Sequence, residues 1–193
     1  MTVLENKITF VKLNKDYYDI LKEWWHSERV KQFWDNSSEM ENDVDAYVLN
    51  GQKSFYDYYI GLYEGVPYAL VMTAEQKKDD YYEYYEKYLS NTGKTYAIDF
   101  MIGNPDFVGK HLSSITLRTF IENYSDEAAD RFIIDPEFDN EVAHRCYIGA
   151  GFADVDEYVV KDGYFKGKRL HLMIRGRNKQ NSINTNEFTK LKK

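Results

Sequence analysis

The segment Ile98-Asp-Phe-Met-Ile-Gly-Asn-Pro-Asp-Phe-Val-Gly-Lys-His-Leu112 organises the predicted fold of this chain. Its beginning belongs to a nearly continuous apolar run over Thr95–Ile102, and such a run predicts a strand buried on both faces. Glycines and a proline interrupt the pattern over Gly103–Gly109 and predict a turn. Apolar side chains then recur at three- and four-residue spacing from Leu112 to Tyr124, which indicates a helix of about three to four turns.

A strand, a glycine-containing turn and a helix in this order can form an anion site. The turn leaves backbone N–H groups unpaired, and the helix adds the positive end of its dipole. Together these groups favour a bound phosphate. Glycine is also a common turn former, so the junction alone leaves a phosphate site and a plain turn both open.

The residues that follow predict a crossover unit. Arg131–Ile134 is a short apolar strand ended by Asp135-Pro136, and Asn140–Ile148 is a helix that Gly149 and Gly151 terminate. A strand–helix–strand order favours a parallel pair of strands. The sequence therefore predicts a mixed α/β fold.

The remaining elements surround this unit. They are a strand at Lys7–Leu13, a helix at Asp16–Trp25 that Asn14 or Asp16 can cap, a short helix carrying Val30, Phe33 and Trp34, an acidic helix at Glu39–Leu49, a hairpin of Phe55–Tyr63 and Tyr68–Thr73, and last strands at Phe152–Val160 and Lys168–Arg175. The segment Lys77–Leu89 fits either a helix or an ordered loop.

Length and charge exclude several classes of protein. The 193 residues suit one domain, which we place at 1–175, followed by a polar tail at 176–193 that we expect to be poorly ordered. The 25 basic and 32 acidic residues give a net charge of −7, which argues against a nucleic-acid partner. Neither a signal peptide nor a membrane-spanning run is visible, so we expect a soluble, cytoplasmic protein without a membrane partner, as a monomer or a homodimer.

Cysteine and histidine offer no framework for a metal. Cys146 is the only cysteine, which excludes a disulfide framework, and the four histidines have no metal-ligand spacing. His144 and Cys146 lie on one helix but do not face each other, so we interpret Cys146 as small packing or as lining near a cofactor, and not as a nucleophile. We interpret His26, His111 and His171 as structural or surface residues. The composition stands out instead for its 18 tyrosines.

The pattern Asn140-x-x-Ala143-x-x-x-Tyr147 followed by Gly151-Phe152 resembles the GNAT superfamily of acetyl-CoA-dependent N-acetyltransferases. Gly109-Lys110-His111 stands where that superfamily carries its pyrophosphate loop. The segments Glu23-Trp24-Trp25, Phe33-Trp34 and Ala97-Ile98-Asp99 look like the aminoglycoside 6′-N-acetyltransferase branch. This resemblance covers most of residues 7–175, and it implies a mostly antiparallel central sheet, flanked by helices, with a parallel pair at the CoA cleft.

The resemblance implies acetyl-CoA as co-substrate and no metal. It places pantetheine along the strand 95–102, where the backbone groups of Met101 and Ile102 would polarise the thioester carbonyl. Asp106 and His111 depart from the superfamily's loop, at its Gln/Arg position and its last Gly/Ala position. The implied cofactor-binding residues are Met101, Ile102, Phe107, Val108, Gly109, Lys110, His111, Leu112, Asn140, Ala143 and Tyr147.

Two residues of the helix 140–148 have implied roles at the cofactor. Tyr147 resembles the superfamily's general acid for the leaving thiolate, although a tyrosine there could equally pack its ring in the core. Asn140 would orient the pantetheine arm. It is also suited to cap the helix, and the two roles are compatible.

Asp99 is a carboxylate within a strand that is otherwise apolar. A buried charge needs a partner, which is either a protein cation in a salt bridge or a substrate ammonium. The resemblance favours the substrate and makes Asp99 a candidate base. It also places Trp34 and Asp35 at the acceptor, where the alternative is a core tryptophan and a helix-terminal aspartate. Tyr82, within the tyrosine-rich segment 81–88, is a candidate wall of the acceptor pocket.

The first hypothesis is an N-acetyltransferase that acts on a primary amine of a small polycationic acceptor. An aminoglycoside-like acceptor, and with it antibiotic resistance, is its sharp version. Acylation of a siderophore or hydroxamate precursor is an alternative within the same class. A non-catalytic GNAT-like binding protein is the second hypothesis, and Asp106 and His111 motivate it.

Overall fold

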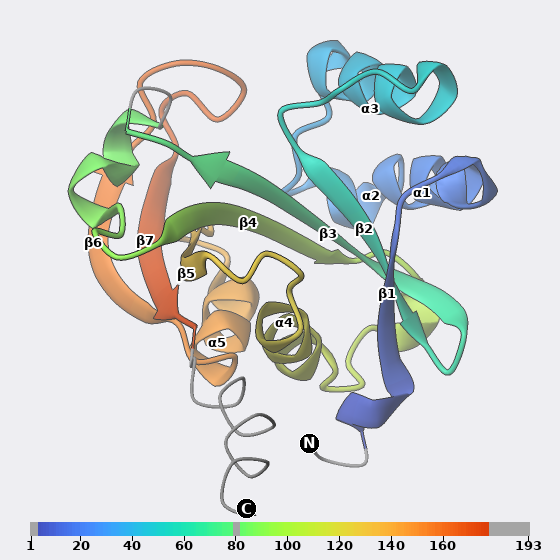
Figure 1. Cartoon of the computed structure of the whole chain (residues 1–193). Coiled ribbons are helices and arrows are strands. Elements are labelled where there is room, and N and C mark those ends of the chain that lie inside the picture. The colour runs from blue at the N-terminus through green and yellow to red at the C-terminus, as the bar shows by residue number, and fades with distance from the viewer. Residues whose placement is uncertain (1–3, 79–81, 178–193) are drawn as a thin grey trace, which may run out of the picture.

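The computed structural model describes residues 4–78 and 82–177 and contains one seven-stranded sheet flanked by helices (Figure 1). The strands are β1 Ile8–Lys12, β2 Asp57–Tyr63, β3 Val66–Gln76, β4 Lys94–Ile102, β5 Ala129–Ile134, β6 Ala153–Val159 and β7 Arg169–Gly176. The α-helices are α1 Tyr18–Trp25, α2 Glu28–Lys31, α3 Ser38–Asn50, α4 Ser113–Glu122 and α5 Glu141–Gly149.

The sheet confirms the predicted mixed topology. Its strand order is β1-β2-β3-β4-β5-β7-β6. In the described sheet β4 and β5 are the parallel pair, and every other neighbouring pair is antiparallel. The crossover that makes β4 and β5 parallel runs through α4, as the strand–turn–helix order predicts.

Strand β3 joins two different cores, because its alternate side chains point to opposite faces of the sheet. Leu70 and Met72 pack with α1, α2 and α3 on one face of the sheet. Val71 packs with α4, α5 and Phe132 of β5 on the other face. Side chains alternate between the two faces of a strand, so this one strand joins both cores. Figure 1 shows the two groups of helices on opposite sides of the sheet.

The hairpin of β2 and β3 has the predicted turn. Glu64 and Gly65 have φ angles of 48° and 83°, so both lie in the left-handed region. Two such residues form the turn whose twist matches that of the flanking strands. The second strand begins at Val66 and ends at Gln76, so it is longer than the predicted Tyr68–Thr73.

Several predicted boundaries are wrong. The predicted short helix ends at Lys31, so it does not contain Phe33 and Trp34. The chain turns there, and Asn36 Nδ2 donates to the Trp34 carbonyl at 2.6 Å. The first helix starts with a 3₁₀ turn at Lys15–Tyr17, where the Asn14 side chain accepts from the Asp16 N–H.

Two further predictions concern the ends of the tyrosine-rich segment and of the chain. Of the undecided segment 77–89, Glu83–Tyr88 forms a 3₁₀ helix, and residues 79–81 lie outside the described structure. The predicted disorder of the tail falls on residues 178–193, which also lie outside it.

Within 4–78 and 82–177, no helix has the length and apolar character needed to span a membrane.

Gly103 fixes how α1 approaches the end of β4. A Cβ atom at Gly103 would lie 2.1 Å from Cδ2 and from Cε3 of Trp24. Trp24 is buried, and its indole therefore lies directly on the glycine backbone. The absence of a side chain at residue 103 lets α1 cover the last residues of β4.

We expect Gly103→Ala to destabilise the protein by about 2–3 kcal/mol, because the indole and the strand must move apart. Urea unfolding measures the change. Gly176→Ala is the matched control, since a Cβ there would have its nearest neighbour at 4.0 Å. We expect that change to stay within about 0.5 kcal/mol. Equal effects of the two substitutions would contradict this account of Gly103.

Candidate functional site

Strands β4 and β5 pair for only part of their length. The parallel pairing joins Lys94–Ala97 to Ala129–Ile133 and stops there. Strand β4 continues to Ile102 and remains paired with β3, up to the Ile102–Ala69 pair. Strand β5 continues to Ile134 with β7 as its partner. The last residues of β4 therefore lack a strand partner on the β5 side.

The backbone of β4 shows which groups face that side. The Gly103 N–H donates to the Tyr68 carbonyl at 2.8 Å, so Gly103 points toward β3. Alternate residues of a strand point the same way, which directs Met101 toward β3 and Phe100 and Ile102 away from it. Phe100 was not among the residues predicted to bind the cofactor. The Ile102 carbonyl accepts from Arg29 Nη2 at 2.7 Å, so Arg29 ties the end of β4 to α2.

Asp99 lies within this partly unpaired stretch. Its side chain is half-buried, as are Phe100 and Ile102, so the predicted burial on both faces holds for Ile98 and Met101 but not for the whole strand. Burial raises the pKa of the Asp99 carboxyl to about 7, and the negative charges of Asp135 and Asp35 add to this shift. Near neutral pH, the carboxyl can therefore both accept and release a proton.

Asp135 directly follows β5 and is the second carboxylate of the site. Its Oδ2 accepts from Tyr85 Oη at 2.6 Å and also from the Tyr158 hydroxyl. Burial raises the pKa of Asp135 to about 6, although these two hydrogen bonds act in the opposite direction. Both phenols donate to the same carboxylate oxygen and carry no positive charge to balance that of Asp135.

Asp35 is the third carboxylate, and the turn after α2 holds it. Its Oδ1 accepts from the Ser37 N–H at 2.7 Å, and its carbonyl accepts from Trp25 Nε1 at 3.0 Å. Trp34 packs edge-on against Trp25, with ring centroids 5.9 Å apart. The predicted pair Trp34 and Asp35 is thus placed by the buried Trp25, and Asp35 is close enough to Asp99 to affect its pKa.

These three carboxylates have no cationic partner within residues 4–78 and 82–177. No lysine, arginine or histidine of the described chain forms an ion pair with Asp35, Asp99 or Asp135. The salt-bridge alternative for Asp99 therefore has no partner residue there. Buried negative charges of this kind are costly unless a cation joins them. The site is suited to bind a positively charged molecule.

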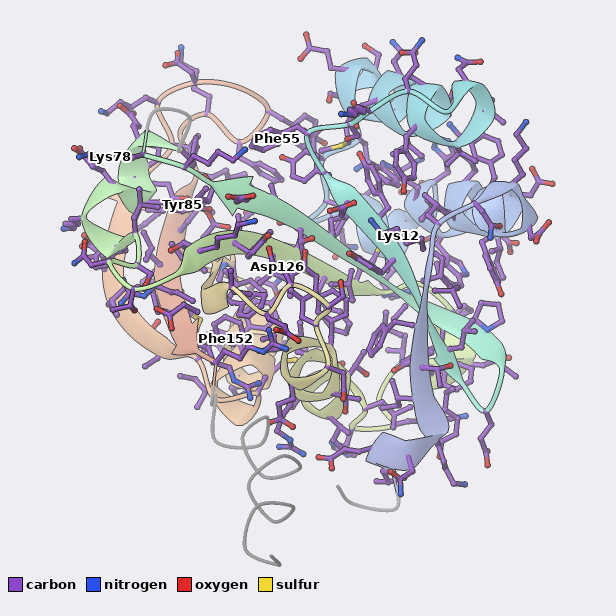
Figure 2. The ribbon with its side chains drawn as sticks, viewed as in Figure 1. Lys12, Phe55, Lys78, Tyr85, Asp126 and Phe152 are labelled. Carbon is purple, nitrogen blue, oxygen red and sulfur yellow. The ribbon has the colours of Figure 1, made fainter. Side chains whose placement is uncertain are left out.

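Tyrosines from the 3₁₀ helix Glu83–Tyr88 and from β6 border the carboxylates. Tyr84 stacks on Tyr158 with ring centroids 4.0 Å apart, and Tyr82 contacts Tyr84 edge-on at 4.9 Å. Tyr82 keeps 40% of its surface exposed, and burial together with the charge of Asp135 raises its pKa to about 12. Figure 2 labels Tyr85 on this segment, beside the end of the sheet formed by β6 and β7. Tyr82 is thus an accessible aromatic group next to Asp135.

Tyr147 lies on α5, on the side that faces the carboxylates. It is buried, and its ring packs near Phe152 with centroids 6.2 Å apart. Burial raises the pKa of Tyr147 well above its usual value, and Cys146, Asp99 and Asp135 contribute further. The hydroxyl therefore keeps its proton at neutral pH. Core packing and proximity to the site are both observed for this residue.

Asn140 caps α5, which is the second of its two predicted roles. Its Oδ1 accepts from the Ala143 N–H at 3.1 Å. Ala143 is half-buried and packs against the core between α4 and α5. Ser114 of α4 donates from Oγ to the Cys146 carbonyl at 2.8 Å, which joins the two helices. Cys146 is partly buried beside this contact, in agreement with a packing role.

The loop before α4 leaves several backbone donors without acceptors. Leu112 is the N-cap of α4 and gives no side-chain hydrogen bond to the helix. Gly109 and His111 have φ angles of 74° and 57° in the left-handed region. Phe107 anchors the loop through its ring, 5.1 Å from that of Tyr68. Exposed, uncapped N–H groups at the start of a ten-residue helix favour an anion.

The two unusual loop residues point away from the packed core. Asp106 and His111 are both exposed, as are Val108 and Lys110. Asp106 donates its backbone N–H to Asn104 Oδ1 at 3.0 Å, which forms the turn into the short 3₁₀ helix Pro105–Phe107. His111 adopts the left-handed conformation that glycine adopts more readily. The loop therefore adopts a left-handed conformation at residue 111 although that residue is a histidine and not a glycine.

A surface hollow of about 460 Å³ lies on another part of the molecule. Both of its cationic groups already have partners, because Lys168 Nζ lies 2.8 Å from Glu137 Oε2 and the Arg169 guanidinium lies 4.0 Å from the centroid of Phe138. We therefore do not consider it the candidate site. Its lining residues are Glu137, Phe138, Asp139, Gly167, Lys168 and Arg169.

Sequence analysis missed three residues of the site. Asp135 was interpreted only as the end of a strand, Tyr85 only as part of the tyrosine-rich segment, and Tyr158 only as part of the strand Phe152–Val160. One signal was available for Asp135, since a polar residue directly after a buried parallel strand lies at the strand's carboxyl end, where ligands commonly bind in α/β sheets. No sequence signal joins Tyr158 to Asp135, because the contact depends on how β6 folds back.

Comparisons with known proteins agree with this architecture. A model of the family described as "Acetyltransferase (GNAT) domain" matches residues 14–160. No curated protein matches the chain by sequence.

Solved structures resemble the fold at low identity. An aminoglycoside N(6′)-acetyltransferase from Legionella pneumophila is 22% identical with a TM-score of 0.73, covering 88% of this chain and 92% of that one. The aminoglycoside acetyltransferase AAC(6′)-Ib in complex with coenzyme A and kanamycin is 20% identical with a TM-score of 0.69, covering 88% and 95%. A spermidine N-acetyltransferase from Vibrio cholerae in complex with CoA and spermine is 10% identical with a TM-score of 0.68, covering 89% and 96%.

The raised pKa values predict how stability depends on pH. The pKa of the Asp99 carboxyl is about 7 in the folded protein, whereas its ordinary value, which applies to the unfolded chain, is 3.8. Between these two pH values the folded state therefore binds more protons than the unfolded state. The free energy of unfolding must then fall as the pH rises from about 4 to about 7. We expect Asp99→Asn to remove roughly 2–4 kcal/mol of this fall.

Urea unfolding at several pH values between about 4.5 and 7.5 measures the effect. Glu127→Gln, at an exposed position, is the control and should leave the slope unchanged. Identical slopes for the wild type and Asp99→Asn would show that Asp99 titrates normally.

Proposed function

The chain belongs to the acetyltransferase (GNAT) domain family, and from this membership we propose that it transfers an acetyl group from acetyl-CoA to a primary amine of a small, polycationic acceptor. The observation that carries the proposal is the group Asp35, Asp99 and Asp135, which is partly buried and has no cationic partner in the described chain. An acceptor with several ammonium groups would supply the missing positive charge.

Asp99 is the proposed base. A primary amine is protonated at neutral pH and must lose that proton before its nitrogen can attack a thioester. A carboxyl with a pKa near 7 takes up the proton more readily than an ordinary aspartate. The amine nitrogen forms a bond to the acetyl carbon while the bond from that carbon to sulfur breaks. Asp99 receives the amine proton, either directly or through water.

Tyr147 is the proposed acid for the departing thiolate. Its hydroxyl is protonated at neutral pH, and α5 holds it on the side of Asp99 and Asp135. The N–H groups of Phe100 and Ile102 face the unpaired side of β4, where they could polarise the thioester carbonyl. Met101 would then contribute through its side chain and not through its N–H group.

The loop 107–112 is the proposed pyrophosphate site. The uncapped start of α4 and the left-handed Gly109 and His111 expose main-chain donors that suit phosphate oxygens. Lys110 adds a positive charge beside them, since its Nζ lies 5.1 Å from the ring centroid of Phe107 in the same loop. These features favour a CoA-binding enzyme over a non-catalytic binding protein.

We propose an aminoglycoside-like or polyamine acceptor. Accessible Tyr82 and the corner of Trp34 and Asp35 offer aromatic and acidic groups for sugars and ammonium groups. The proteins of known structure that resemble the fold include complexes with kanamycin and with spermine. An aminoglycoside acceptor would make this an antibiotic-modifying, cytoplasmic enzyme, and the same carboxylates would repel nucleic acid.

Thiol release from acetyl-CoA tests the function with kanamycin-type compounds, spermine, lysine and hydroxylamine-type siderophore precursors as acceptors. We expect turnover with the polycationic compounds. Asp99→Asn should lower kcat by about 10²–10⁴-fold while the Kd for CoA stays within about twofold. Tyr147→Phe should lower kcat at least about tenfold, with the same unchanged Kd.

If no acceptor raises thiol release above hydrolysis, the proposed function is wrong. If both variants lose CoA binding equally, the assigned roles are wrong even if the enzyme is active.

Gly109→Ala tests the loop. Alanine is disfavoured at a φ of 74°, so the loop must rearrange, and we expect the Kd for CoA to rise about tenfold. Gly163→Ala is a matched control, because Gly163 has a φ of 79° and equally open surroundings in the loop between β6 and β7. Both variants should lose about 1 kcal/mol of stability, but Gly163→Ala should bind CoA normally. Calorimetry measures the two Kd values, and equal weakening by both changes would argue against a phosphate site at 107–112.

A further inference from the structure

A second cluster of functional groups lies where α5 packs against β6 and β7. His144 of α5, Asp154 of β6 and His171 of β7 each turn one ligand atom toward a common point, and these atoms all lie within 4.8 Å of one another. His144 Nε2 is 2.9 Å from both carboxylate oxygens of Asp154. His171 Nδ1 is 3.4 Å from Asp154 Oδ1. From the sequence alone, His171 was expected to be a structural or surface residue.

An irregularity in β6 brings the carboxylates to the histidines. The register shifts between Asp154 and Asp156, where Asp154 pairs with Met173 and Glu157 pairs with His171. Without the extra residue, Asp154 and Glu157 would point to opposite faces, because they are an odd number of positions apart. The bulge puts both on the face of His171. Met173 on that face is buried with Tyr147 of α5, so α5 covers it (Figure 1).

Stacking holds the two imidazoles in place. The His144 and His171 rings stack with centroids 4.3 Å apart. Phe138 stacks on His171 at 4.7 Å and 16°. His171 is therefore held between two rings, and its backbone N–H donates to the Pro136 carbonyl at 3.0 Å. Ring orientations that are fixed before binding are a property of built metal sites.

We propose that His144, Asp154 and His171 bind a zinc ion at a site separate from the proposed transfer chemistry. Two imidazole nitrogens and one carboxylate are a common zinc ligand set, with water or a fourth residue completing the tetrahedron. Ligands about 2.0–2.2 Å from one ion lie at most roughly 4.3 Å apart, so small side-chain shifts would close the set.

Access and a fourth ligand are both available. The Asp154 side chain is 43% exposed, which gives an ion a route from solvent, whereas those of His144 and His171 are 26% and 14% exposed. Glu157 Oε1 lies 4.0 Å from His171 Nδ1 and could complete the set, although Glu157 also pairs with Arg169. A zinc ion would join α5 to the hairpin of β6 and β7, and so brace the helix that carries Tyr147.

Zinc binding is measured on the untagged full chain after treatment with a chelator. Calorimetry with zinc chloride should give one ion per chain, and His171→Gln and Asp154→Asn should each weaken binding at least about tenfold. His26→Gln is the matched control, because His26 Nε2 lies 3.1 Å from Glu41 as another surface histidine–carboxylate pair but belongs to no three-ligand group in the described chain. It should bind zinc as the wild type does.

Two further measurements separate a built site from surface binding. Cobalt(II) in place of zinc should give a visible absorption band that His171→Gln abolishes. At a zinc concentration of about 100 times Kd, the Tm should rise by roughly 5–10 °C in the wild type and in His26→Gln only.

The proposal fails if zinc binds with the same affinity to His171→Gln as to the wild type. It also fails if His26→Gln weakens zinc binding as much as His171→Gln does. No binding at all would mean that the three residues form only a hydrogen-bonded network. These readouts do not depend on acetyl transfer, so they stand or fall separately from the proposed function.

Discussion

The rest of the structure depends on one constraint: β4 continues beyond the point where its pairing with β5 ends. Strand β5 leaves β4 after Ile133 but stays paired with β7, and the chain then reaches Asp135 and Pro136. Proline has no N–H group and cannot extend a ladder. The remaining backbone of β4 is thus left open inside a sheet, where open edges are normally covered. A ligand with amide groups of its own would restore the missing pairing.

The acidic site is stable only because other packing is strong. Asp99, Asp135 and Asp35 come from three segments, and each segment is anchored elsewhere: Asp99 by pairing with β3, Asp135 by two phenols and Asp35 by Trp25. Burial, with the negative charges of Asp135 and Asp35 added to it, raises the pKa of Asp99 and costs stability above neutral pH. Local rules are commonly violated at functional sites and compensated around them. Binding of a cation would remove that cost, so affinity and stability are coupled.

Residues that interrupt a pattern could be predicted, whereas residues joined by long-range pairing could not. Asp99 was identified because a carboxylate stands out in an apolar strand, and Gly109 because glycines mark a turn. Asp135 and Tyr158 meet only after β6 has folded back onto β7. His144, Asp154 and His171 meet because one extra residue in β6 reverses which way a side chain points. A bulge has no periodic signature, and a shift of one residue changes the face of every later side chain. The prediction made the short second helix too long because the spacing of Trp34 suggested a helix. In the structure the chain turns after Lys31, and this turn brings Trp34 against Trp25.

The many tyrosines have a physical explanation in this acidic chain. Phenol hydroxyls donate to Asp43, Asp45, Asp126, Asp135 and Asp156. At Asp126, Lys94 also contributes, and the tyrosine and lysine hydrogen bonds lower the pKa to about 2. At Asp135 two phenols donate without a cation, and burial raises the pKa to about 6. Tyrosine thus satisfies carboxylate oxygens without neutralising them. Where a lysine would cancel the field at Asp99, two tyrosines preserve it, and this leaves the negative charge of the site for a bound amine.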